Sequence, residues 1–272
     1  MRSLIGYLVC LIVAVTIAFT FTPRTTLDVA GEPLRADRLQ INGMVYLDQR
    51  VVAVGERGTV LLSDDQGASW QPATVTPQRD LTLTALVALT DSRLLAVGHD
   101  GWILRSDDQG AHWAEVRYDS ELAEPLLGIW SAGAQQVLAF GSFGKFYQSD
   151  DAGRTWRATA LSVDSAHLNG MDGGPDGRRM VVGEQGLVMR TDDAGQHWQT
   201  LPAFYNGSLF GVVRLSAERW VTYGMRGHVF VSQDFGQSWQ QVAVGNTLPL
   251  YGHVLLPKGD GVLIVGAGSS MV

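Results

Sequence analysis

The chain has 272 residues, of which 32 are glycine and only 17 % are charged, a balance typical of an all-β protein with many tight turns. The formal net charge of −7 provides no basic stripe for a nucleic acid, so we expect no nucleic-acid partner. The single cysteine, Cys10, lies in the apolar N-terminal stretch, which excludes a disulfide framework and a thiolate metal site.

The first 24 residues form a separate segment. Arg2 precedes an uncharged, mainly apolar stretch of 18 residues from Leu4 to Phe21. A helix needs about 17–25 such residues to span a bilayer, and a leading basic residue keeps the N-terminus in the cytoplasm. We therefore expect residues 1–24 to be a single-pass anchor in the inner membrane, with the rest of the chain on the periplasmic side. A cleaved signal segment is the alternative, although small residues are poorly placed for cleavage.

One eight-residue motif occurs five times in the remainder of the chain. It has Ser or Thr at its first position, Asp at the third, Gly at the fifth and Trp at the eighth. The copies are 63–70, 106–113, 149–156, 191–198 and 232–239, and successive tryptophans are 43, 43, 42 and 41 residues apart. A constant period of about 20–50 residues indicates a repeat architecture, and four short strands per period are typical of a β-propeller blade.

Four strands can be placed in each repeat. A G-x-x-G pair, such as Gly55 and Gly58, precedes every motif and is flanked by β-rich runs, which predicts a hairpin between the second and third strands. The first strand lies upstream, for example at 83–89, and often begins with a small residue that suits a crowded propeller axis. The fourth strand is expected to start at the tryptophan, as at 113–117.

The last repeat is incomplete. It begins at Tyr251, gives a second strand at 262–266 and stops at Val272 without a motif or an outer strand. Because an open strand edge invites aggregation, residues 25–36 are predicted to complete this last blade as its outer strand. We therefore predict an all-β fold: a six-bladed β-propeller of four-stranded antiparallel blades over residues 25–272, with an N-terminal transmembrane helix. A truncated chain would allow seven blades.

The motif resembles the Asp-box, or BNR, repeat of sialidases, sortilin-type receptors and the photosystem II assembly/stability factor family. The even tandem of a G-x-x-G pair and a box over residues 39–272 is most similar to that last family. This resemblance implies a non-enzymatic helper of membrane proteins that needs no cofactor. Bacterial relatives are associated with exporters of the resistance-nodulation-division (RND) type. The implied partner is a membrane protein complex, either an RND-type exporter or photosystem II in a phototroph.

The repeated box positions are expected to be structural. A carboxylate at the third position can accept several N–H groups and fix the turn between the third and fourth strands, and the tryptophan can pack between blades. Calcium binding by the paired acidic residues is the alternative, although Gln233 replaces one of them in the fifth box. The structural set is Asp65, Asp108, Asp151, Asp193 and Asp234, with Trp70, Trp113, Trp156, Trp198 and Trp239.

The residues inside the G-x-x-G pairs differ from blade to blade. We expect these turns to share one face with the links between blades, opposite the boxes, where loop residues can serve function. Arginine, phenylalanine, methionine and acidic residues on one uneven face suit protein binding. The candidate partner-binding residues are Glu56, Arg57, His99, Asp100, Phe143, Glu184, Met225 and Arg226. Ordinary solvated turns are the alternative for each of them.

Two other functions remain open. A glycoside hydrolase of the sialidase-like propeller type would need paired carboxylates and an arginine triad. Glu56, Asp100 and Glu184 could supply carboxylates, but nothing pairs them in the sequence, and the Phe/Tyr-Arg-Ile-Pro signature of sialidases is absent. A periplasmic receptor for a peptide or small ligand is the other alternative. The six histidines are scattered, so we assign no catalytic residue and no metal ligand.

Overall fold

The computed structural model describes Tyr7, residues 11–17, Thr20, and residues 38–272 except 122, 164, 246, 258 and 260. Two compact units are present, residues 1–34 and residues 35–272. In the first unit, residues 11–17 are helical. Within the described part of the chain, no helix is both long and apolar enough to cross a membrane. Half of the predicted anchor stretch, and all of the predicted strand at 25–36, lie outside the described residues.

The second unit consists of six sheets, here numbered blade one to blade six in chain order. Blade one contains β1 (Ile41–Leu47), β2 (Arg50–Gly55), β3 (Val60–Ser63) and β4 (Gln71–Pro72). Blade two contains β5 (Thr74–Thr76), β6 (Leu83–Ala88), β7 (Leu94–Gly98), β8 (Ile103–Ser106) and β9 (His112–Arg117). Blade three contains β10 (Leu126–Ser131), β11 (Val137–Gly141), β12 (Phe146–Ser149) and β13 (Arg157–Ala158).

The remaining blades repeat the same order. Blade four contains β14 (Leu168–Gly173), β15 (Arg179–Gly183), β16 (Val188–Thr191) and β17 (Gln199–Thr200). Blade five contains β18 (Leu209–Arg214), β19 (Trp220–Gly224), β20 (Val229–Ser232) and β21 (Gln240–Val242). Blade six contains β22 (Leu250–Leu255) and β23 (Val262–Gly266). The all-β fold of four-stranded antiparallel sheets is thus confirmed.

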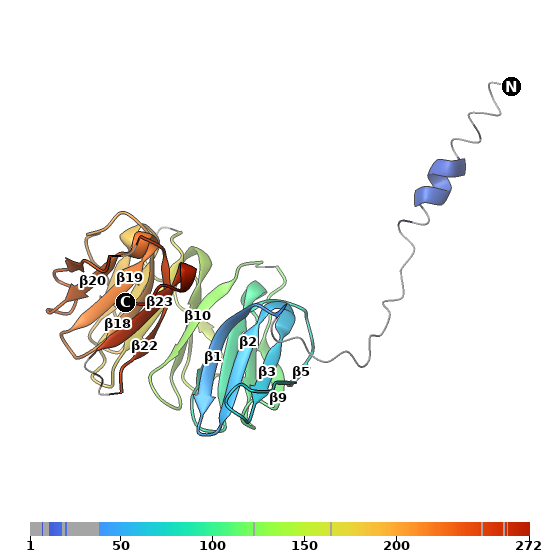
Figure 1. The fold of residues 1–272 in the computed structure, drawn as a ribbon, viewed down its shortest axis with the longest axis horizontal. Coiled ribbons are helices and arrows are strands. Elements are labelled where there is room, and N and C mark those ends of the chain that lie inside the picture. The colour runs from blue at the N-terminus through green and yellow to red at the C-terminus, as the bar shows by residue number, and fades with distance from the viewer. Residues whose placement is uncertain are drawn as a thin grey trace. The chain divides into compact units, whose positions relative to one another are not determined.

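The first strands of successive blades lie next to one another. Contacts join β1 to β6, β6 to β10, β10 to β14, β14 to β18 and β18 to β22, and Figure 1 shows β10 between the blade of β1 and the blade of β18. The small residues predicted for this axis allow the close approach. A Cβ atom on Gly170 would lie 2.8 Å from the Cα atom of Gly211 in the next blade, so a larger residue has no room there.

The hydrophobic core lies between the blades. The second strands of blades one to five are buried on both faces and are mainly apolar; in β7, Leu94 to Val97 are 0 % exposed. One cluster joins Val52 and Val54 of blade one to Leu94 and Trp102 of blade two. Such clusters fasten neighbouring sheets because each apolar face is covered by the next one.

Three details differ from the sequence prediction. The sequence predicted a long fourth strand after each motif, but only β9 is long. The other fourth strands, β4, β13, β17 and β21, have two or three residues. The sequence also did not predict β5, which belongs to the link from blade one. This strand pairs in parallel with β9 at the outer edge of blade two. Among the described residues of blade six, a bridge between Val265 and Met271 continues the sheet beyond β23, a contact that the sequence prediction did not include.

Candidate partner-binding face

In the first five blades, the two ends are built differently. At the turn end, a short 3-10 turn joins the second and third strands: η2 (Glu56–Gly58), η3 (His99–Gly101), η4 (Ser142–Gly144), η5 (Glu184–Gly186), η6 (Met225–Gly227) and η7 (Ala267–Ser269). At the box end, the Asp box joins the third and fourth strands. Links between blades reach the turn end, since Gly101 N donates to Glu124 O at 3.2 Å and Gly144 N donates to Ala166 O at 2.9 Å. The predicted shared face of turns and links is therefore confirmed.

The turns are closed by backbone groups alone. In η2, Gly55 N donates to Thr59 O at 3.0 Å and Thr59 N donates to Glu56 O at 3.0 Å. The middle residue is left-handed, with φ of 55° at Arg57, and the same conformation recurs at Asp100, Phe143, Gln185 and Arg226. Non-glycine residues adopt this conformation at an energetic cost. The closure itself places no demand on the side chain, which explains why the sequence varies there.

The predicted partner-binding residues divide into two groups. Glu56 accepts a hydrogen bond from Gln40 N at 3.2 Å, and Glu184 accepts one from His167 N at 3.1 Å, so these two carboxylates fasten the preceding link to the turn. Asp100 is half-buried. The exposed members are Arg57, His99, Phe143, Met225 and Arg226.

One large apolar residue of the turns is Phe143, which is 54 % exposed. Its ring meets the His167 ring edge-on, with centroids 4.8 Å apart. Beside it lies a cleft of about 530 Å³. The cleft is lined by Arg117, Phe143, Gly144, Lys145, Phe146, Tyr147, Ala158, Thr159, Ala160, Leu161 and Val163.

This cleft, here called the blade-three cleft, combines apolar walls with unused polar groups. Nε of Arg117 and Oγ1 of Thr159 are buried and have no hydrogen-bond partner. The Arg117 guanidinium lies 4.6 Å from the Tyr147 ring centroid, and Lys145 pairs with Glu124 at 3.0 Å. The sequence prediction found only Phe143 of this set. Leu161 and Val163 lie in the link 159–163, which follows the turn of blade three. Because a turn and the link after it share one face, these two apolar residues could have been predicted to lie beside Phe143.

The box end is locked by side chains. Oδ1 of Asp65 accepts from Ser69 N at 2.8 Å and Ser63 Oγ at 2.7 Å, and its Oδ2 accepts from Ser69 Oγ at 2.6 Å. These donors stabilise the charged form and lower the pKa of Asp65 to about 2. The same arrangement recurs at Asp108, Asp151, Asp193 and Asp234.

The histidines of the boxes take part in this lock. His112 and His197 are both exposed. In addition, His112 Nδ1 lies 2.7 Å from Asp108 Oδ2 and His197 Nδ1 lies 2.6 Å from Asp193 Oδ2, which is the position that a serine or threonine hydroxyl fills in the other boxes. Because protein donors already surround these carboxylates, the boxes are turn locks in this fold.

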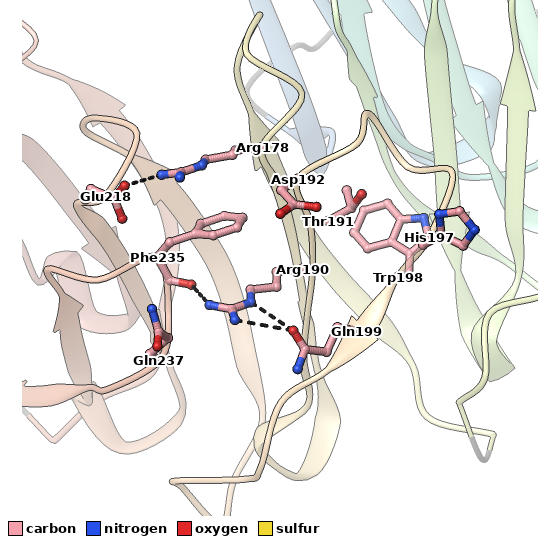
Figure 2. A pocket seen from close by; sticks show the side chains of 10 residues that line it. All are labelled: Arg178, Arg190, Thr191, Asp192, His197, Trp198, Gln199, Glu218, Phe235 and Gln237. Carbon is pink, nitrogen blue, oxygen red and sulfur yellow. Dashed lines mark hydrogen bonds and ion pairs between the residues drawn. The ribbon is translucent and has the colours of Figure 1, made fainter.

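A second pocket, of about 410 Å³, lies at the box end between blades four and five. Figure 2 shows Arg190 directed toward Phe235 and Gln199. Arg190 donates to Phe235 O at 2.7 Å and to Gln199 Oε1 at 3.3 Å, and Arg178 forms an ion pair with Glu218. Both guanidinium groups lie near the Phe235 ring, at 5.0 and 5.1 Å. The two arginines that line this pocket are therefore bonded to blade five. In the blade-three cleft, by contrast, Arg117 Nε and Thr159 Oγ1 have no hydrogen-bond partner.

One carboxylate lies on a first strand near the axis. Asp172 accepts from Arg214 N at 2.7 Å and from Trp130 Nε1 at 3.3 Å, so it joins blades three, four and five. Burial raises the pKa of Asp172. Nearby, the Tyr223 hydroxyl lies 2.7 Å from His253 Nδ1, and burial raises the pKa of Tyr223.

The repeated boxes, the G-x-x-G turns and the adjoining first strands define the class of protein: a β-propeller of Asp-box repeats. The family model described as photosynthesis system II assembly factor YCF48 matches residues 45–180, half of the chain. The chain belongs to this family. No curated protein matches it.

Solved structures show the same fold. The structure titled "YCF48 bound to D1 peptide" has a TM-score of 0.50 and 20 % identity and covers 86 % of this chain and 92 % of that one. YCF48 from Cyanidioschyzon merolae has a TM-score of 0.50 and 14 % identity, with 88 % and 96 % covered. The GH74 xyloglucanase from Xanthomonas campestris has a TM-score of 0.66 and 18 % identity, with 85 % of this chain but only 44 % of the enzyme covered.

Proposed function

We propose that the protein is a non-enzymatic accessory or assembly subunit whose turn end binds an extended segment of a membrane protein. The observation that carries this proposal is the blade-three cleft. Its apolar walls, Phe146, Leu161 and Val163, suit the side chains of a peptide. The unpartnered Arg117 Nε and Thr159 Oγ1 suit the polar backbone or a carboxylate of the same peptide, because buried polar groups require partners.

Family membership supports this choice of ligand. One solved YCF48 structure is described as bound to a D1 peptide, so a family member with this fold takes a peptide as its ligand. The exposed Phe143 at the rim of the cleft is the type of aromatic residue that dominates binding energy at interfaces. The proposed surface comprises this cleft and the exposed turn residues.

The proposed setting is the periplasmic side of the inner membrane. Residues 1–24 would anchor the chain there, since Leu4 to Phe21 carries no charge. We further propose a six-bladed ring in which residues 25–36 supply the outer strand of blade six. The proposed client is a membrane protein complex, either an RND-type exporter or, in a phototroph, photosystem II.

Co-purification tests the proposal. The tagged full-length protein is isolated from native membranes in mild detergent, and accompanying proteins are quantified by mass spectrometry. We expect one membrane protein in stoichiometric amount, and at least tenfold less of it with a variant carrying Arg57→Ala, Phe143→Ala and Arg226→Ala. The matched control changes exposed box-end residues, Arg154→Ala and Gln196→Ala. A partner that survives the turn-end changes but is lost with the box-end changes would contradict the assigned face.

A second candidate function is glycoside hydrolysis. The GH74 xyloglucanase shares the propeller fold, and this likeness favours testing xyloglucan first. The carboxylates Glu56 and Glu184 are hydrogen-bonded to their own links, which favours a structural role over catalysis for both. Release of reducing ends from xyloglucan by the purified chain would replace the accessory-subunit proposal, whereas a receptor function would appear as small-ligand binding without turnover.

A further inference from the structure

Three of the four asparagines in the chain are followed by glycine, at Asn42, Asn169 and Asn206. This dipeptide is chemically labile, because glycine has no side chain to shield its backbone nitrogen or to restrict its backbone. The nitrogen can attack the carbon of the preceding side-chain amide and close a five-membered imide. Since the three sites share this local chemistry, the fold decides which of them can react.

Asn42 is exposed but is held on a first strand. It lies in β1, and its Nδ2 donates to Leu83 O of blade two at 2.8 Å. The next residue, Gly43, pairs with Val54 of β2. Ring closure would require the Asn42 amide to leave its acceptor and the strand backbone to rotate out of its extended form. Exposure of the side chain is therefore not sufficient for reaction at this site.

Asn169 is held in the same way in blade four. It lies in β14, and its Nδ2 donates to Leu209 O of blade five at 2.9 Å. The next residue, Gly170, pairs with Val182 of β15. Both asparagines thus tie one blade to the first strand of the next blade, and both are protected by the sheet.

Asn206 lies in a link rather than in a strand. It is exposed and follows β17 in the link between blades four and five, at a bend of the backbone. Among the residues that the structure describes, neither its side-chain amide nor the N–H group of Gly207 has a hydrogen-bond partner. The attacking nitrogen and the amide carbon are therefore both free to approach each other, without loss of a bond.

Packing favours glycine at position 207. A Cβ atom on Gly207 would lie 2.4 Å from Oη of Tyr205. The Tyr205 hydroxyl donates to Met225 O at 3.2 Å, and its ring meets the His228 ring edge-on with centroids 4.9 Å apart. A larger residue at position 207 would therefore displace a side chain that packs against blade five.

We propose that Asn206 is a site of spontaneous deamidation and isomerisation. Gly207 N attacks Cγ of Asn206, the bond from Cγ to the amide nitrogen breaks, and ammonia leaves with the proton of the Gly207 N–H group. Water then opens the imide. Cleavage at Cγ gives aspartate, and cleavage at the main-chain carbonyl carbon gives isoaspartate, which adds a methylene group to the backbone. Either product adds a negative charge at the turn end, because Gly186 N of η5 donates to Gly207 O at 2.8 Å.

Peptide mapping of the purified full-length protein tests the site. The protein is kept in mildly alkaline buffer and digested, and the peptide of each asparagine is scored by mass spectrometry for aspartate and isoaspartate. The Asn206 peptide should convert at least about tenfold faster than the peptides of Asn42 and Asn169, since those two react only when their strands open locally. Equal rates at the three sites, or an Asn206 that stays intact, would overturn the proposal.

Unfolding in urea supplies a control that needs no variant. The three sites should then convert at similar rates, because the sheet no longer protects two of them. A much slower conversion of Asn206 in the folded protein than in urea would show that the link holds it unreactive, and the proposal would be wrong.

Two variants provide a matched comparison by isoelectric focusing. Asn206→Gln should no longer accumulate an acidic form of the folded protein, whereas Asn42→Gln should accumulate it as the wild type does. Unchanged accumulation by Asn206→Gln would place the reaction elsewhere and refute the site. The result is independent of the proposed partner, since the reaction needs only this chain and water.

Discussion

The two ends of each blade solve the same problem, a reversal of the chain between short strands, in different ways. At the box end, side chains close the turn: each aspartate accepts from a backbone N–H group and from hydroxyl or imidazole groups. At the turn end, backbone groups close it. A closure by side chains fixes the sequence of the box, whereas a closure by backbone groups leaves the sequence of the turn free to vary from blade to blade.

Acid should affect the box end most, because the aspartates of all five locks lose their charge as the pH falls. The pKa of each box aspartate is lowered in the folded state by its donors, to about 2 for Asp65. A lowered folded-state pKa stabilises the protein above the unfolded value, about 3.9, and this stabilisation is lost as pH falls through the folded value. The raised pKa of Asp172 acts in the opposite direction.

We therefore expect the urea midpoint of unfolding to fall steeply between about pH 4 and about pH 2. Circular dichroism across a pH series measures it. The variant Asp151→Asn, which removes one titrating group, should have a shallower acid limb than the wild type. A midpoint that stays constant over this range would show that the boxes contribute no pH-dependent stability.

Removal of a single lock should have the next largest effect. Asp151 accepts from Thr155 N at 2.9 Å, Thr155 Oγ1 at 2.7 Å and Ser149 Oγ at 2.8 Å. Its replacement by alanine leaves these donors without an acceptor and should lower the free energy of unfolding by about 1–3 kcal/mol, toward the lower figure where water can replace it. Denaturant titration measures this change. Asp100→Ala at the turn end is the comparison, and an equal loss there would remove the distinction between the two ends.

The smallest expected effect is a gain at the turn end. Gln185 has φ of 55°, a conformation that glycine adopts more easily. Gln185→Gly should therefore raise the free energy of unfolding, by about 0.5 kcal/mol after the greater chain entropy of glycine is subtracted. Its neighbour Glu184 holds His167 N at 3.1 Å, so Glu184→Gly should instead destabilise. If Gln185→Gly and Glu184→Gly lowered the free energy of unfolding by similar amounts, the left-handed residue Gln185 would not be strained.

Periodicity predicted most of the fold. The five boxes and the G-x-x-G pairs recur because each does one local task, so their spacing predicts strands and reversals directly from the sequence. The prediction missed β5, because Thr74 pairs with His112 of the next blade and local patterns carry no signal for a parallel contact over that separation. It also placed the fourth strand too early in most blades, since the tryptophan there belongs to the turn.

The candidate sites were less predictable than the fold. Variation within the turns identified the exposed Phe143 and Arg226, but it could not separate them from Glu56, whose carboxylate is used by Gln40 N. The blade-three cleft requires Leu161 and Thr159, which lie in a link without a repeat pattern.

The parallel strand β5 sets the size of a folding unit at the N-terminal side of the propeller. It leaves blade one immediately after β4, but its partner β9 lies at the far end of blade two. During synthesis, Thr74 therefore waits for residue 112 to emerge before its backbone is paired. Blades one and two should therefore gain and lose structure together, as one cooperative block in hydrogen exchange.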